Sequence, residues 1–125
     1  MLVEEKGMLN MAKKTKPMDF TRRKCKACEG GAKPYSEKQI NKLLKSLPDW
    51  EFRNGSLVRA FEFMNFYQTM AFVNTVAWLA NMENHHPDME VGYSRCVIRY
   101  NTHAIGGISE NDFICAAKIN AILAL

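Results

Sequence analysis

The sequence predicts an α+β domain in which a four-stranded antiparallel sheet carries three helices packed on one face, in the order helix, hairpin, helix, hairpin, helix. Two observations indicate this fold. Three stretches place apolar residues at helical spacing, and two pairs of alternating stretches are joined by short turn signals. Helices on one face of the sheet bury the apolar stripe of every element. With 125 residues, 47% of them hydrophobic, the chain can build one such core.

The first helix is marked at both ends. Ser36 followed by Gln39 has the spacing of a capping box, in which the two side chains bond to each other's backbone N–H groups. The apolar residues in the segment 40–47 then recur at helical spacing and form one stripe. Pro48 cannot continue the helix, so we expect the helix to end before it.

The first hairpin is predicted by Asn54-Gly55, because both residues tolerate the positive φ of a type I′ turn. It joins residues 50–53 to residues 57–63, whose alternation indicates strands. Asn65 can cap a second helix over residues 66–81.

The second helix is apolar over an unusually wide surface. One face holds Phe66, Met70, Val73, Ala77 and Ala80, and another holds Phe72, Val76 and Leu79. We expect this helix to be covered on two sides, by its own sheet and by a second subunit. Val76 is taken as an outward position, with a core position as the alternative.

The second hairpin pairs residues 89–93 with residues 96–102 and turns near Ser94-Arg95. Pro87 ends the helical run before it. Gly106-Gly107 then turn the chain into the last helix.

The last helix begins at Ser109, with Asp112 as its third residue. This spacing is a good capping pair, and capping explains Asp112 about as well as a catalytic role does.

Charge divides the chain into a basic leader and a nearly neutral domain. Residues 1–33 hold nine Lys or Arg against four acids, and residues 34–125 hold eight against nine. The polar leader is interpreted as a mobile tail before a single domain at 34–125, and binding of nucleic acid is not expected. No apolar run reaches the length of a membrane span, and no secretion signal is recognisable, so we expect a cytoplasmic protein.

The cysteines raise the possibility of a metal site. Cys25 and Cys28 have the spacing of half a zinc site, and a zinc protein that uses them with two histidines is one alternative. The other two cysteines, Cys96 and Cys115, are isolated in apolar segments. We therefore favour structural thiols, no metal and no organic cofactor.

The most informative feature is the placement of the histidines. All three in the chain, His85, His86 and His103, fall within nineteen residues and lie at the ends of predicted elements. Imidazoles without an obvious nucleophile suit an acid–base reaction, in which one group donates a proton as another removes one. Three aromatic residues could offer a flat surface to a ring-shaped substrate, namely Trp50, Tyr93 and Tyr100.

The motifs together resemble the pterin-4a-carbinolamine dehydratase family. The resemblance spans roughly residues 25–123 and rests on Asn84-His85-His86-Pro87-Asp88, Tyr93, Thr102-His103, Gly106-Gly107, Ser109-Glu110-Asn111-Asp112-Phe113 and Leu47-Pro48-Asp49-Trp50. It includes Cys25-x-x-Cys28-Glu29-Gly30-Gly31, which looks like the leader of bacterial members. It implies that the catalytic residues are His85, His86, His103 and Asp112. It also implies that the substrate is bound by His85, His86, Pro87, Thr102, His103, Ala104 and Ile105.

Two positions depart from the family pattern. Family members often carry an acid four residues before the first histidine, where this chain has Asn81, and another after the third histidine, where it has Ala104. Neither departure removes a proton-transfer group.

The resemblance implies a hydro-lyase that dehydrates 4a-hydroxytetrahydropterin to quinonoid dihydropterin, in the recycling of the cofactor of aromatic amino acid hydroxylases. It implies a homodimer or homotetramer and a functional link to such a hydroxylase. A non-catalytic dimerisation or interaction module for a regulatory protein is the alternative, and retention of all three histidines favours catalysis.

Overall fold

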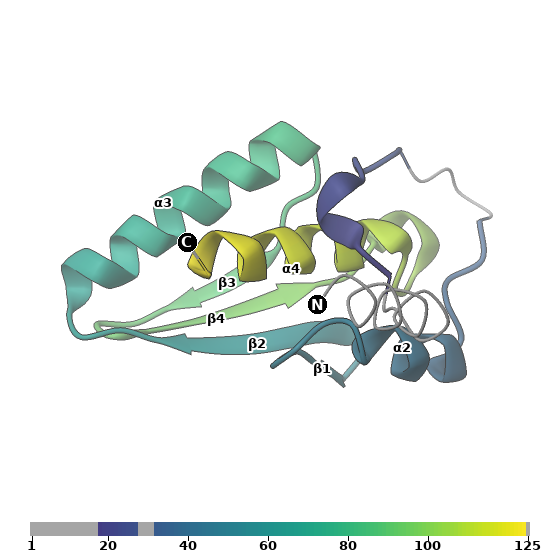
Figure 1. The fold of residues 1–125 in the computed structure, drawn as a ribbon, viewed down its shortest axis with the longest axis horizontal. Coiled ribbons are helices and arrows are strands. Elements are labelled where there is room, and N and C mark those ends of the chain that lie inside the picture. Colours follow the sequence, from purple (N-terminus) through teal and green to yellow (C-terminus); the bar gives the residue numbers. More distant parts are fainter. Residues whose placement is uncertain (1–17, 28–31, 125) are drawn as a thin grey trace, which may run out of the picture.

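The computed structural model describes residues 18–27 and 32–124, and this part of the chain forms a four-stranded antiparallel sheet with helices packed against it (Figure 1). The strands are β1 (Glu51–Arg53), β2 (Ser56–Glu62), β3 (Asp88–Val91) and β4 (Arg95–Tyr100). The α-helices are α2 (Glu37–Leu44), α3 (Phe66–Glu83) and α4 (Glu110–Leu123), and two short 3-10 helices are η1 (Phe20–Arg22) and η2 (His103–Ile105). The predicted α+β class and element order are confirmed.

The strand order β1-β2-β4-β3 places both hairpins in one sheet, with β2 and β4 in its centre. In the second hairpin Asp88 lies opposite Arg99, and Val91 lies opposite Cys96. Antiparallel pairing therefore puts the beginning of β3 beside the end of β4. The segment that enters β3 and the segment that leaves β4 lie at the same end of the sheet as a result.

The core lies between the sheet and the helices α3 and α4. Alternate residues of β2 and β4 point into it, as the expected alternation requires. They are Leu57, Phe61, Cys96, Ile98 and Tyr100, and none is more than 4% exposed. Helix α2 lies at the β1 side of the sheet and adds Ile40 to the same core.

The predicted caps and turn are present. Ser36 and Gln39 form the capping box of α2, and the Asn65 side chain accepts a hydrogen bond from the backbone N–H of Gln68 at the start of α3. Asn54 and Gly55 have φ values of 50° and 80°, as the type I′ turn requires. Helix α2 ends at Leu44 rather than near 47, because its last turns tighten before Pro48.

Helix α3 uses the Phe72, Val76 and Leu79 face for the core. Val76 is only 1% exposed, so the expectation that it points outward is wrong. The other side of α3 leaves Trp78 and Met82 more than half exposed. Trp78 and Met82 lie outside both faces that the sequence named, and the face with Met70, Val73 and Ala77 is half-buried.

The described part of the leader differs from the mobile tail that its composition predicts. Phe20 in η1 is 1% exposed, and its ring stacks on Phe113 of α4 at a centroid distance of 5.4 Å. A single aromatic residue gave no periodic signal, yet its burial packs η1 against α4. Residues 1–17 and Cys28 lie outside the described residues. In the part of the chain that is described, no helix is both long and apolar enough to cross a bilayer.

Candidate active site

The three histidines lie around one pocket because of the sheet register. His85 and His86 precede β3, and His103 follows β4, so antiparallel pairing of these strands brings the three together. They line a pocket of about 280 Å³, together with residues from the leader, α3 and α4. The prediction that the imidazoles share a site is consistent with this geometry.

The end of α3 positions His85. Asn84 adopts the left-handed conformation with φ of 50°, and the backbone N–H of His85 donates to the carbonyl of Ala80 at 3.1 Å. This arrangement terminates a helix and fixes the direction of the next residue. His85 is therefore held by backbone geometry before its side chain makes any contact.

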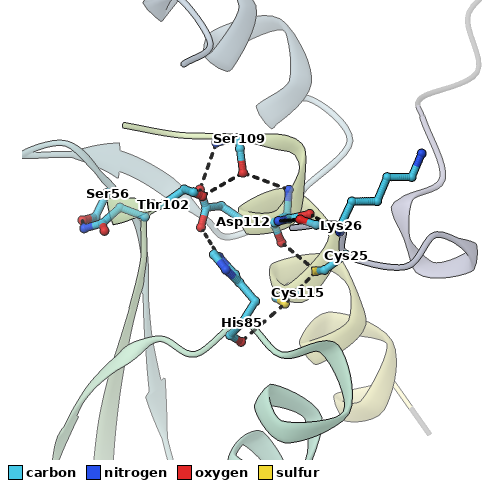
Figure 2. Close-up of polar contacts among 10 residues, drawn as sticks. Cys25, Lys26, Ser56, His85, Thr102, Ser109, Asp112 and Cys115 are labelled. Atoms are coloured by element: carbon cyan, nitrogen blue, oxygen red, sulfur yellow. Dashed lines mark hydrogen bonds and ion pairs between the residues drawn. The ribbon is translucent and has the colours of Figure 1, made fainter. Parts of the chain in front are cut away.

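The His85 side chain is bound to a buried carboxylate (Figure 2). Its Nε2 lies 2.6 Å from Oδ1 of Asp112, whose side chain is 0% exposed. The other oxygen, Oδ2, accepts hydrogen bonds from the Thr102 hydroxyl at 2.8 Å and from the Ser109 N–H at 3.0 Å. A carboxylate can only accept, so the His85 proton lies on Nε2 and Nδ1 is left for other partners.

Asp112 therefore combines the two roles that the sequence left open. Through Oδ2 it completes the capping box of α4 with Ser109, and through Oδ1 it orients His85. One carboxylate can do both because each oxygen has its own partner.

Tyr100 supports the other side of His85. The two rings are nearly parallel, with an interplanar angle of 11° and a centroid distance of 5.7 Å. Tyr100 is fully buried and does not line the pocket, so it holds the imidazole rather than a substrate. The other two aromatic candidates also lie elsewhere, since Trp50 is buried against Phe61 and Tyr93 packs against Phe66. The expectation of a flat aromatic surface in the pocket is wrong for all three.

The remaining two histidines are held much more loosely. His86 and His103 are both exposed, and neither side chain has a polar partner among the residues that the structure describes. His103 stands in η2, which ends at Gly106 with φ of 68°. The pocket thus has one fixed imidazole and two exposed ones.

The structure places most of the predicted site residues at the pocket. His85, His86, Thr102, His103 and Ala104 line it, and Asp112 lies behind His85. Pro87 and Ile105 are half-buried and do not line it.

Sequence reasoning missed several lining residues. They are Lys26, Ala27, Glu83, Asn84, Asn101 and Asn111. Cys25 also lines the pocket, but the sequence singled it out only for its spacing from Cys28 and as part of the resemblance, with no role in the site. Asn84 and Asn111 stand in the motifs of the resemblance, but the sequence gave them no role, and no motif pointed to Glu83.

Glu83 places a buried carboxylate beside this pocket. It is 9% exposed and accepts from the backbone N–H of Cys25 at 2.9 Å and from Lys118 at 3.1 Å. Burial raises the pKa of Glu83, but these two hydrogen bonds and the Lys118 charge outweigh burial, so the pKa lies below its usual value. Glu83 is thus an ionised structural group at neutral pH.

Two thiols meet at the wall of the pocket that Cys25 lines. The Sγ atoms of Cys25 and Cys115 are 3.6 Å apart. The hydrogen bond with Cys25, followed by burial, raises the pKa of Cys115 well above its ordinary value. Within the described residues no group of three or more His, Cys, Asp or Glu could hold a metal ion, and Cys28 of the zinc alternative lies outside them.

Comparison with known proteins gives concordant matches. The family model described as pterin 4 alpha carbinolamine dehydratase matches residues 33–122. The inferred pterin-4-alpha-carbinolamine dehydratase of Nitrosomonas eutropha is 55% identical over 106 residues, covering 84% of this chain and 94% of the relative. Its counterpart in Legionella pneumophila is 51% identical over 108 residues, covering 84% and 96%. The crystal structure of a transcriptional coactivator/pterin dehydratase from Brucella melitensis matches with a TM-score of 0.68 and 30% identity, covering 71% of this chain and 97% of that one.

Proposed function

The chain belongs to the pterin-4a-carbinolamine dehydratase family, and we propose that it dehydrates 4a-hydroxytetrahydropterin to quinonoid dihydropterin in the pocket of the three histidines. The observation that carries this proposal is the pair formed by His85 and the buried Asp112 at that pocket. A pocket of about 280 Å³ is close to the lower end of the volumes of small-molecule sites.

The reaction requires two proton movements. Hydroxide is a poor leaving group, so the hydroxyl at C4a must gain a proton before it departs as water. The ring nitrogen must lose a proton as the new double bond forms. Two imidazoles can supply both steps and return to their starting states by exchange with solvent, without a metal or an organic cofactor.

We assign the donor role to His85. Its orientation is fixed by Asp112 on one side and by the Tyr100 ring on the other, and a general acid must be aimed at the leaving atom. Because Nε2–H is bound to Asp112, His85 would act in its doubly protonated form and deliver the proton from Nδ1, which leaves the neutral ring with its remaining proton on Nε2.

His103 is assigned as the acceptor of the ring-nitrogen proton, and His86 positions the pterin. Both line the pocket and are exposed, which suits groups that exchange protons with water. Thr102 and Ala104 would contact the substrate, and Pro87 and Ile105 would act through the backbone around them. The missing acids at Asn81 and Ala104 leave Asp112 as the carboxylate that this mechanism uses.

The decisive test measures 4a-hydroxytetrahydropterin directly. The purified protein should accelerate loss of this compound above its spontaneous dehydration, and treatment with a chelator should leave the rate unchanged. A rate equal to the spontaneous one in a folded protein would overturn the proposal.

The open face of α3 supports self-association, as a homodimer or a homotetramer. Trp78 is 61% and Met82 56% exposed on this face, and Tyr67 in the first turn of the same helix is 88% exposed. Apolar side chains gathered on one face are typical of an interface. A cytoplasmic location and a link to an aromatic amino acid hydroxylase are parts of the same proposal.

The open face of α3 also favours the alternative function, a non-catalytic interaction module. That function would not need the His85–Asp112 pair. A protein that binds partners but does not accelerate dehydration would favour it.

A further inference from the structure

One wall of the pocket comes from outside the region that the family model matches. That match begins at residue 33, whereas Cys25, Lys26 and Ala27 line the pocket beside the histidines. We call residues 23–27 the strap. The strap continues from η1, which Phe20 fixes to α4.

Asn111 holds the strap by its backbone. The side-chain oxygen of Asn111 accepts from the backbone N–H of Lys26 at 3.0 Å, and its side-chain nitrogen donates to the backbone carbonyl of Lys26 at 2.6 Å. Asn111 thus pairs with one peptide unit through both polar atoms, as a neighbouring β-strand would. Asn111 is 7% exposed, so loss of these bonds would leave its buried side-chain amide with fewer hydrogen-bond partners.

Glu83 holds the strap from the other side. Its Oε1 accepts from the backbone N–H of Cys25, while Lys118 binds the other oxygen. The Cys25 thiol also lies 3.6 Å from the backbone carbonyl of Asn111. Arg23 adds an ion pair with Glu110 at the start of α4. Two buried polar side chains and one surface pair therefore keep the strap in place.

The same two elements hold the strap and the catalytic pair. Asn111 immediately precedes Asp112 in α4, and Glu83 stands two residues before His85 at the end of α3. The strap is therefore anchored at the two places where the geometry of the His85–Asp112 pair is set.

We propose that the strap is part of the pterin site: Cys25 and Ala27 contact the bound substrate, and Asn111 and Glu83 are positioning residues that act through the strap. The inference rests on the proposed function and adds binding residues that the family's matched region does not contain. Its expected effect is on substrate binding, because no strap group lies among the proton-transfer groups.

Alkylation of Cys25 tests the contact directly. Cys25 is half-buried, whereas Cys96 and Cys115 are 0% exposed and serve as unreactive internal references. In a Cys28→Ser background, saturating 6-methyl-7,8-dihydropterin should slow modification of Cys25 by iodoacetamide at least about fivefold. Peptide mass spectrometry gives the rate at each cysteine.

The outcomes separate the two proposals. Unchanged alkylation of Cys25 in a protein that dehydrates the substrate would overturn the strap proposal and leave the proposed function standing. If the protein does not dehydrate the substrate and the dihydropterin does not protect Cys25, both proposals are contradicted.

Kinetics of Asn111→Leu test the positioning role. Leucine is close to asparagine in size and removes both bonds to Lys26, so KM should rise about tenfold while kcat stays within about twofold. The matched control is Asn41→Leu, at an exposed position of α2 that does not line the pocket, and it should change neither constant. A fall in kcat with an unchanged KM, or full protection of Cys25 in the variant, would contradict the proposal; circular dichroism confirms the fold.

Discussion

The two sides of the pocket hold their imidazoles in opposite ways. His85 is 13% exposed, bound to a buried carboxylate and stacked on a buried ring, whereas His103 is exposed on a short 3-10 helix without a polar side-chain partner in the described residues. The fixed ring has one defined tautomer and one direction. The exposed ring can turn and exchange protons with water. This difference is the reason for assigning the directed proton donation to His85 and the acceptor role to His103.

The fixed side is also the one where catalysis and stability are coupled. Asp112 is a fully buried carboxylate, and such a group is tolerated only when its oxygens are well bonded. Three donors reach it, from His85, Thr102 and Ser109. Removing a hydrogen bond to Asp112 should lower both rate and stability, while changing the exposed side should alter the rate alone.

The largest effect is expected for His85→Gln. Glutamine can still donate a hydrogen bond toward Asp112 but cannot transfer a proton, so kcat should fall about 10²–10⁴-fold. The melting temperature should change little, whereas His85→Ala should also destabilise the protein because it removes a donor to a buried carboxylate. Steady-state rates and thermal melts of the two variants measure this. Near-normal turnover in His85→Gln would end the assignment of His85 as the acid.

The next largest effect on turnover is expected for His103→Ala. Turnover should fall about 10²-fold, at the lower end of the range for acid–base groups, because water can partly replace an exposed acceptor. Stability should stay within about 0.5 kcal/mol, as for most surface changes.

The double variant of both histidines sharpens this comparison. If the imidazoles act as a unit, it should lose less than the product of the two single effects. A destabilised His103→Ala would show that the exposed side is structural after all.

Asp112→Asn separates orientation from capping. Asparagine keeps one oxygen for the cap, so the loss of stability should be small, about 0.5–1 kcal/mol. Its amide nitrogen then faces His85 and demands the opposite tautomer, so kcat should fall about 10–100-fold, by the tautomer effect known for carboxylate–histidine pairs. Urea unfolding and kcat measured on the same sample test both. A loss of stability with a normal kcat would show that Asp112 acts as a helix cap and does not orient His85 for catalysis.

Much of this site could be predicted from local sequence signals. The second hairpin alone requires that the residues before β3 meet the residues after β4, and so brings His85 and His103 to one end. The spacing of Ser109 and Asp112 indicates the start of α4. Such features depend on neighbours in sequence, which is why they can be recognised without the structure.

The features that could not be predicted depend on contacts between distant elements. Asp112 reaches His85 only because the start of α4 approaches the end of α3. The strap pairs with Glu83 and Asn111 across 58 and 85 residues, and its polar, aperiodic sequence gave no sign of packing. Val76 could not be placed because α3 is apolar on two faces, and only the tertiary structure tells which one is covered.

The smallest effect concerns Glu83, which stands on the same side as His85 but takes no part in proton transfer. Its pKa is lowered in the folded protein by the hydrogen bonds of Cys25 and Lys118, which outweigh burial. A carboxyl whose folded pKa is lowered adds stability that is present above its ordinary pKa of 4.5 and is lost as the pH falls through the folded value. The melting temperature of Glu83→Gln should therefore lie below that of the parent above about pH 5, and the two should converge in more acidic solution. Between pH 6 and 8 Glu83 stays ionised, so the shape of the pH–kcat profile should be the same in both proteins. A shifted profile in Glu83→Gln would show that the fixed side of the pocket holds a second titrating group and that the contrast between one fixed and two exposed imidazoles is incomplete.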